Sequence, residues 1–244
     1  KRGGTSGKGS SNCSKGGGFQ VEELARMNYP DGIAILGDDW KYEELASRTT
    51  ELLKRENVTI FEAAFLQNGL FIRVDILDKK GDEIQLIEVK AKSIHKSRHT
   101  GFFGKRGTLE SGWVPYLYDV AFQKFVIEES QPSWKVKAYL MLANKDAVST
   151  VDGINQNFRV SKKSNLRTGI IKPDNLNLTD LGDSLLATVN IEQEVEYIKE
   201  NNPVDTSRSF VDLIEYYKSY YVSDVKIFTE IGRQCKDCEF QCEE

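Results

Sequence analysis

Long apolar runs are missing from this sequence of 244 residues. No stretch of about 18 or more apolar residues occurs, so the sequence predicts no membrane-spanning helix and no membrane partner. A leader in which charged residues precede an apolar segment is also missing, and we therefore expect a cytoplasmic protein. Excess positive charge is missing too, because the formal net charge is −4 and the pI is about 5.5. These values argue against indiscriminate DNA binding by the whole surface, but they are compatible with a local basic patch.

Cysteine is scarce, and its four occurrences are unevenly placed. Cys235, Cys238 and Cys242 lie within the last ten residues, whereas Cys13 stands alone near the start. In a reducing compartment such clustering favours a metal site over disulfides. The spacing Cys-x2-Cys-x3-Cys is typical of metal sites, and it leaves both zinc and a [4Fe–4S] cluster open.

The rest of the composition predicts one main α/β body. Residues 1–17 are low-complexity Gly, Ser and Lys, which indicates a flexible leader or a remnant of cloning rather than folded structure. We expect the main domain over residues 18–230, with an irregular insertion at 150–190 that carries Arg159, Lys162, Lys163, Arg167 and Lys172. Residues 231–244 form the cysteine-rich tail.

Hydrophobic periodicity predicts the order of the elements in this body. One helix begins near Phe19 and ends before Pro30, and a second follows Asp38 and Asp39, which are candidate caps. Three apolar runs separated by turn signals then indicate an antiparallel meander of strands over 58–65, 70–77 and 84–91. A helix over 116–129, a strand over 135–142 and helical spacing over 191–201 and 209–221 complete the pattern. We therefore expect a mixed sheet flanked by helices.

Charged residues interrupt two of the predicted strands. Asp75 lies near the end of one strand, and Glu88 and Lys90 share one face of the next strand, so two carboxylates and one ammonium can converge. Burial of such a group is costly unless its members pair with one another or bind a cation. A cross-strand salt bridge is the plainer interpretation. The alternative is a site in which carboxylate oxygens hold Mg²⁺ or Mn²⁺ beside a phosphate while the lysine assists the attacking water.

This arrangement resembles the PD-(D/E)XK nuclease superfamily, in which an apolar-Asp element precedes an apolar-apolar-(Asp/Glu)-x-Lys element. The resemblance implies a restriction-endonuclease-like core and hydrolysis of phosphodiester bonds. It implies that Asp75, Glu88 and Lys90 are catalytic. It also implies that Asp75, Glu88 and the Val89 carbonyl bind the metal.

Neighbouring segments resemble the RecB-like members of that superfamily. Glu62 in "TIFEAAF" resembles an acidic residue of the preceding strand, although a strand-end salt bridge also explains it. In "YLYDVAFQKFV", Asp119 and Gln123 share one helical face, and Gln123 stands where the Gln-x-x-x-Tyr motif of these enzymes usually has tyrosine. The early helix of the relatives commonly carries a metal-binding histidine, whereas "GGFQVEELA" offers only Glu22 and Glu23.

A loop rich in Gly, Lys, Arg and His spans residues 92–112. Its cationic side chains predict contacts with nucleic-acid phosphates, although a solvated loop is the plainer alternative. They are Lys92, Lys96, Arg98, Lys105 and Arg106. His95 and His99, the only histidines, lie in the same loop and suit phosphate contact better than metal ligation.

The segments from "GGFQVEELARMNYPDG" to "IGRQCKDCEF" resemble the front domain of a bacterial family that joins such a nuclease module to iron–sulfur-type cysteines. AddAB-type nucleases and CRISPR-adaptation exonucleases have similar cysteines, one before the nuclease core and three after it. The resemblance implies that Cys235 and Cys238 are ligands, that Cys13 and Cys242 are poorer matches, and that the chain is a fragment with a further domain as partner.

Three functions are compatible with these features. The first is a metal-dependent nuclease that acts on DNA rather than RNA, in repair, recombination or defence. The second is a module that keeps the nuclease fold without catalysis and binds nucleic acid or a partner through the basic loop and the insertion at 159–172; the missing early histidine motivates it. In the third, the cysteine tail is a zinc knuckle used for protein assembly.

Overall fold

The structure is a computed structural model that describes residues 11–38, 40–161, 169–228 and 232. For residues 11–17, 160, 161 and 169 it describes the backbone alone. The chain divides into two compact units, Lys1–Ile198 and Lys199–Glu244. Within the described residues, no helix is long and apolar enough to cross a bilayer.

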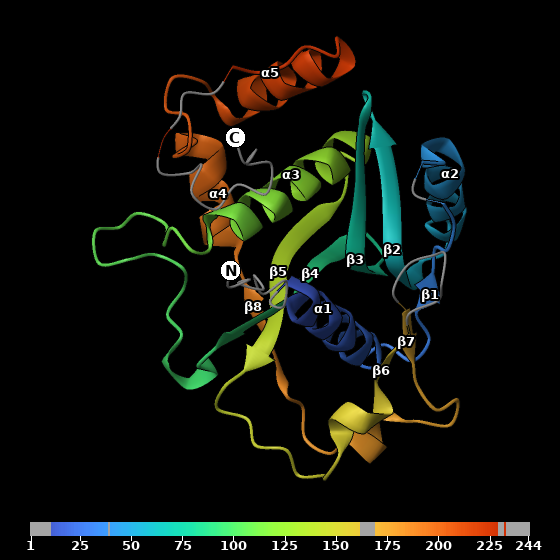
Figure 1. Ribbon diagram of the computed structural model, residues 1–244. Helices are drawn as coiled ribbons and strands as arrows, with labels where there is room; N and C mark the ends of the chain where they lie inside the picture. The colour runs from blue at the N-terminus through green and yellow to red at the C-terminus, as the bar shows by residue number, and fades with distance from the viewer. Residues whose placement is uncertain (1–10, 39, 162–168, 229–231, 233–244) are drawn as a thin grey trace, which may run out of the picture. The chain divides into compact units, whose positions relative to one another are not determined.

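A mixed sheet of six strands forms the centre of the first unit, in the order β1-β2-β3-β4-β5-β8 (Figure 1). Its strands are β1 (Ile33–Ala34), β2 (Asn57–Gln67), β3 (Leu70–Lys80), β4 (Glu83–Ile94), β5 (Lys135–Asn144) and β8 (Leu186–Asn190). The pairs β2–β3, β3–β4 and β5–β8 are antiparallel, and β1–β2 and β4–β5 are parallel. The predicted meander and the predicted mixed sheet flanked by helices are therefore confirmed.

The turn between β2 and β3 shows why the meander is readable from sequence. Asn68 and Gly69 have φ values of 50° and 74°. Two consecutive residues with positive φ match the twist of the flanking strands, and Asn-Gly is the pair that adopts this conformation most easily. The dipeptide thus fixes the register in which β2 and β3 pair.

Two helices cover the part of the sheet that carries the charged residues. Helix α1 (Ser11–Arg26) packs Ala25 against Ile87 and Val89 of β4. Helix α3 (Val114–Ser130) has Pro115 in its first turn and bonds to Glu88 and Lys90, which alternate with those apolar residues. In Figure 1, β4 and β5 accordingly pass between α1 and α3.

Helix α2 (Tyr42–Leu52) packs on β2 and buries Leu45 and Thr49. The Thr49 hydroxyl oxygen accepts a hydrogen bond of 2.9 Å from the backbone N–H of Ala64, beyond the short stretch that β1 pairs. A buried donor at the end of that pairing is thereby satisfied.

Two helix starts differ from the prediction. The first helix begins at Ser11 instead of near Phe19, so the backbone of residues 11–17 is helical although we assigned it to a leader. Apolar periodicity begins only at Phe19 and gives no signal for the earlier turns. Helix α2 has Lys41 as its N-cap without a side-chain cap. The Asp38 carbonyl accepts a hydrogen bond from the Lys41 N–H, and the Asp38 carboxylate pairs with the Lys41 ammonium instead of capping the helix. The cap prediction for Asp38 was wrong, and Asp39 lies outside the described residues.

The predicted insertion at 150–190 contains more regular structure than expected. Its elements are η2 (Ile154–Asn157), β6 (Arg159–Ser161), β7 (Gly169–Ile171), η3 (Leu178–Leu181) and β8. Strands β6 and β7 form a separate antiparallel pair. Phe158 and Leu181 pack on Met27 just after α1, and β8 joins the main sheet at β5. These short strands were missed because such segments become strands only by pairing with partners elsewhere in the sequence.

The second unit contains helix α5 (Phe210–Val222), which begins where helical spacing predicted it. Ser209 is its N-cap and accepts a hydrogen bond from the Asp212 N–H. In the preceding loop, the Asn202 amide donates to the carbonyls of Asp205 and Arg208. The predicted ligands Cys235, Cys238 and Cys242 lie outside the described residues, and of Cys13 only the helical backbone is described.

Candidate active site

The sheet opens on both sides of Asp75. The β3–β4 ladder ends at the pair Ile76–Ile87, so Asp75 would come opposite Glu88 but does not pair with it. Instead, Asp75 Oδ2 accepts a hydrogen bond of 2.8 Å from the Val89 N–H. On the other side, the β2–β3 ladder skips the position where Glu62 faces Asp75, and Glu62 has a φ of 56°. These two openings give the charged side chains room that a regular sheet would deny them.

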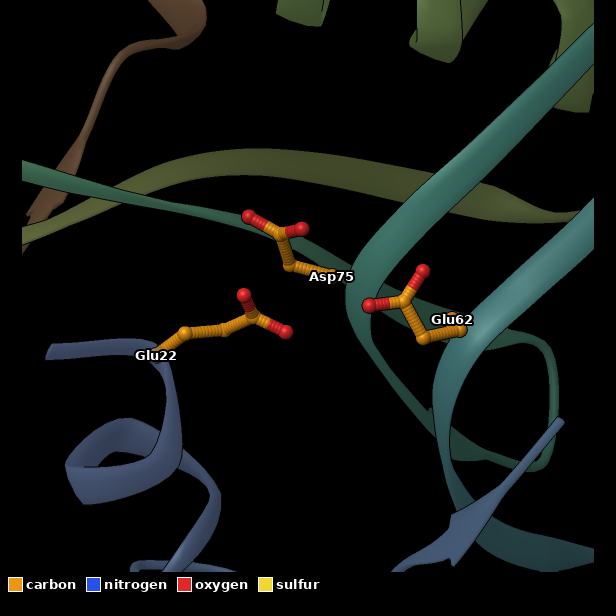
Figure 2. A group of neighbouring side chains, drawn as sticks. All are labelled: Glu22, Glu62 and Asp75. Carbon is orange, nitrogen blue, oxygen red and sulfur yellow. The ribbon is translucent and has the colours of Figure 1, made fainter. Parts of the chain in front are cut away.

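Three carboxylates meet at this opening. Oxygen atoms of Glu22, Glu62 and Asp75 all lie within 4.8 Å of one another. Figure 2 shows the three side chains pointing toward one another from α1, β2 and β3. A group of carboxylate oxygens at this separation matches the donor type that Mg²⁺ and Mn²⁺ prefer.

Two arginines hold Glu62 in place. Arg26 donates hydrogen bonds to Glu22 and, at 2.7 Å, to Glu62 Oε1, and Arg73 lies 3.0 Å from Glu62 Oε2. The Arg26 guanidinium also lies over the Phe61 ring, 5.4 Å from its centroid. Neither arginine was predicted from the sequence. A signal was present, because Arg26 follows Glu22 by one helical turn and Arg73 shares a strand face with Asp75.

Burial shifts the proton affinity of the carboxylates. Loss of solvent raises the pKa of Glu22 to about 7, with the Glu62 charge adding to the rise and Arg26 opposing it. Burial, followed by the charge on Glu88, raises the pKa of Asp75 well above its ordinary value, while the bond from the Val89 N–H acts in the opposite direction. Without a cation, the group therefore holds protons that solvent-exposed carboxylates would release.

A second set of polar side chains continues from β4 to α3. Lys90 Nζ lies 2.5 Å from Glu88 Oε1 and 3.2 Å from Asp119 Oδ2. The Gln123 amide donates to Glu88 Oε2 at 3.0 Å and to Asp119 Oδ1 at 3.1 Å. Its own carbonyl oxygen Oε1 is buried and has no hydrogen-bond partner among the residues that the structure describes. Glu88 is only 4% exposed, so these bonds fix a carboxylate that water hardly reaches.

The pKa shifts of this second set follow from the same burial. Burial raises the pKa of Glu88, and Lys90 and Gln123 oppose the rise. For Lys90, burial lowers the pKa, but the Glu88 and Asp119 carboxylates outweigh it and the net pKa is raised. Lys90 is accordingly a fixed cation at neutral pH, suited to stabilise negative charge and not to accept a proton.

The charges of the two sets do not balance. Glu22, Glu62, Asp75, Glu88 and Asp119 are five carboxylates, whereas Arg26, Arg73 and Lys90 are three cations. With all five carboxylates ionised, the excess is two negative charges, which one divalent cation would balance. Hard oxygen donors, this excess and the unpaired Gln123 Oε1 all fit a Mg²⁺ or Mn²⁺ ion with bound water.

The structure brings together most of the residues that the sequence predicted. Asp75, Glu62, Glu88, Lys90 and Gln123 lie in the two connected sets. Val89 contributes its N–H, and a metal bond from its carbonyl stays a prediction. Of the two early glutamates, Glu22 faces Asp75, whereas Glu23 pairs with Lys172 at 2.6 Å. Asp119, noted only as a neighbour of Gln123, belongs to the site through Lys90.

Of the five cations predicted in the basic loop, Lys92 lies near the second set of polar side chains, because it shares the Tyr116 ring with Lys90. Lys92 lies beside Trp113 and Tyr116 at the start of α3. The other four predicted cations, Lys96, Arg98, Lys105 and Arg106, are exposed, and the first and last residues of η1 (Lys96–Arg98) are two of them.

Both histidines of the loop have structural neighbours. His95 Nδ1 forms a hydrogen bond of 2.8 Å with Asp146 Oδ1, and Asp146 Oδ2 accepts from the Ser97 N–H. The His99 ring lies against Phe102, with 4.5 Å between centroids. Phosphate contact by these side chains stays a prediction.

In comparisons with known proteins, no family model, no curated protein and no solved structure matched this chain.

Proposed function

We propose that this protein is a metal-dependent nuclease with a restriction-endonuclease-like core, which hydrolyses DNA phosphodiester bonds. The observation that carries the proposal is the excess of two negative charges where the sheet opens around Asp75. Five carboxylates from five elements are costly to gather around three cations unless a further cation joins them.

Each residue of the site has a proposed role in metal binding or hydrolysis. Asp75 and Glu88 would hold the Mg²⁺ or Mn²⁺ ion, with Glu22 as the helix-borne ligand in place of a histidine. The bound ion would supply activation of water and neutralise charge on the phosphate. Arg26 and Arg73 fix Glu62, and Gln123 fixes Glu88. Lys90 stabilises the charge that grows on the phosphate oxygens and orients the attacking water.

A second candidate function is a nucleic-acid-binding or assembly module without catalysis. One observation favours it: Glu62 is neutralised by two arginines and Glu88 by Lys90, so these carboxylates have partners without any metal. Such a module would bind DNA in a salt-dependent manner and leave it intact.

Cleavage of DNA in the presence of Mn²⁺ distinguishes the two. The substrates are circular and linear DNA, each single- and double-stranded, with RNA of the same sequence in parallel. We expect the wild type to cut DNA and Lys90→Met to bind but not cut. Lys80→Gln is the control, because Lys80 is an exposed lysine at the far end of β3. Intact substrates with the wild type, or equal cutting by Lys90→Met, would refute the nuclease.

A further inference from the structure

Lys92 occupies an irregular position in β4. The register between β4 and β5 shifts between Lys90 and Ser93, so two residues of β4 are inserted there without partners on β5. Such a bulge redirects the side chains that it carries. Lys92 is one of the two inserted residues, and the bulge directs it toward the start of α3.

Two aromatic rings and one carbonyl hold the Lys92 ammonium. Its Nζ lies 4.2 Å from the Trp113 ring centroid and 4.8 Å from that of Tyr116. It also donates a hydrogen bond to the carbonyl oxygen of Gly112. Trp113 contacts Phe102 in a tilted arrangement, with 4.6 Å between centroids, and Phe102 contacts His99 in the same way. The rings that hold the ammonium are thus themselves held by ring contacts.

The charge of Lys92 is not neutralised by these contacts. Among the described residues Lys92 has no carboxylate partner, whereas Lys90 has two. Aromatic rings attract a cation through their quadrupole but leave its full charge in place. A long side chain that is ordered in advance and still charged can bind an anion without a further loss of side-chain entropy.

Lys92 lies next to Lys90. Both ammonium groups lie over the same Tyr116 ring, Lys90 at 5.7 Å and Lys92 at 4.8 Å from its centroid. Lys90 already contacts two carboxylates, so Lys92 is the one of these two ammonium groups that is left to bind a further anion. The next phosphate of a nucleic-acid strand would supply such an anion beside Lys90.

We propose that Lys92 binds the phosphate next to the one that is hydrolysed, and that Trp113 and Tyr116 are positioning residues that hold its ammonium. This inference rests on the proposed nuclease function. It assigns the two lysines to consecutive phosphates of one strand, and it makes Lys92 the residue that sets which phosphodiester bond reaches Lys90.

Equilibrium binding of DNA tests the role of Lys92 under conditions in which no cleavage occurs. The probe is a fluorescein-labelled single-stranded oligodeoxynucleotide, titrated at several salt concentrations with Ca²⁺ in place of Mn²⁺. For Lys92→Gln we expect about tenfold weaker binding and a slope of log K against log salt that is smaller by about 0.7. Lys80→Gln is the control and should bind as the wild type does.

Cleavage kinetics test the two rings. Trp113→Leu and Tyr116→Leu keep Lys92 but remove the ring faces, so KM should rise severalfold while kcat changes little. Tyr116→Phe keeps the face and should restore the wild-type KM. A positional shift of the cut in Lys92→Gln is expected as well. Unchanged affinity and salt slope in Lys92→Gln would overturn the inference, as would unchanged KM in both leucine variants.

Failure of the nuclease proposal would look different. If the wild type binds DNA but never cuts it, the salt slope of Lys92→Gln still decides whether Lys92 contacts a phosphate, and a smaller slope supports the contact. If the wild type neither binds nor cuts DNA, both proposals are refuted.

Discussion

Asp75 is the residue at which the sequence and the structure agree most usefully. Its place on one strand and the position of Glu88 and Lys90 on the next were visible in the sequence, because strand pairing and side-chain alternation follow simple rules. The prediction that Asp75 lies near the end of its strand was wrong, because β3 continues to Lys80. The choice between Glu22 and Glu23 was not visible. It depends on the rotation of α1 about its axis, which its packing on β4 determines.

The substitution Asp75→Asn should reduce cleavage without destabilising the fold. We expect Mn²⁺-dependent cleavage to fall by at least about a hundredfold. The metal-free protein should be at least as stable as the wild type, because the asparagine carbonyl can still accept the bond from the Val89 N–H while the carboxyl group that burial penalises is gone. The measurements are initial cleavage rates and thermal unfolding.

Asp78→Asn is the matched control for that variant. Asp78 lies on the same strand and is also buried, but it accepts a hydrogen bond from Thr59 away from the site. It should cut DNA like the wild type. Equal activity of the Asp75 and Asp78 variants would contradict the role of Asp75.

Glu22 makes the free energy of unfolding of the metal-free protein depend on pH. Its pKa is raised from 4.5 to about 7 by burial. Between those values the folded protein keeps a proton that the unfolded chain has released, so the free energy of unfolding falls as the pH rises. The contribution is up to about 3 kcal/mol, and it is complete below pH 4.5 and lost above pH 7.

Urea unfolding in EDTA from pH 5 to pH 8 measures this contribution. Glu22→Gln should flatten the pH dependence and be more stable than the wild type at pH 8. Glu23→Gln removes a carboxylate of the same helix outside the cluster and serves as control. Parallel curves for Glu22→Gln and the wild type would show that Glu22 does not contribute.

At the scale of elements, the distortion of β2 at Glu62 opens the site. A φ of 56° in a residue other than glycine is costly, and the pairing with β3 is interrupted at this point. The pairs of Glu62 with Arg26 and Arg73 help to stabilise this conformation. The alternation of apolar and polar residues predicted the strand, but it did not predict the residue at which φ becomes positive.

Two substitutions at position 62 isolate the backbone effect. Glu62→Ala and Glu62→Gly both remove the carboxylate, and only glycine adopts the left-handed conformation without strain. We expect the glycine variant to be more stable by about 1 kcal/mol, measured by urea unfolding. An alanine variant of equal or greater stability would mean that β2 does not need this conformation.

Other elements show where sequence reasoning succeeds and fails. The meander was predicted because Asn68-Gly69 and the apolar runs are local signals. Strand β8 was not predicted, because a five-residue segment becomes a strand only by pairing with β5. The start of α1 was missed because its first turns carry no apolar periodicity.

At the scale of the whole molecule, the cysteines extend the account beyond the described residues. We predict that Cys235 and Cys238 are ligands of a [4Fe–4S] cluster, or of zinc as the alternative. Protein purified without oxygen should then contain iron and acid-labile sulfide and absorb visible light. Cys235→Ser should lose both. Zinc without sulfide would exclude the cluster. Protein that contains neither iron nor zinc would contradict the metal site.

The central claim is that carboxylates at the opening around Asp75 hold a divalent cation. The most direct measurement is anomalous diffraction from a crystal of the protein soaked in Mn²⁺. We predict an anomalous peak about 2.1 Å from an oxygen of Asp75 and from a second carboxylate, Glu22 or Glu88. A well-ordered map with Asp75 bound only to the Val89 N–H, and no peak beside it, would contradict the account.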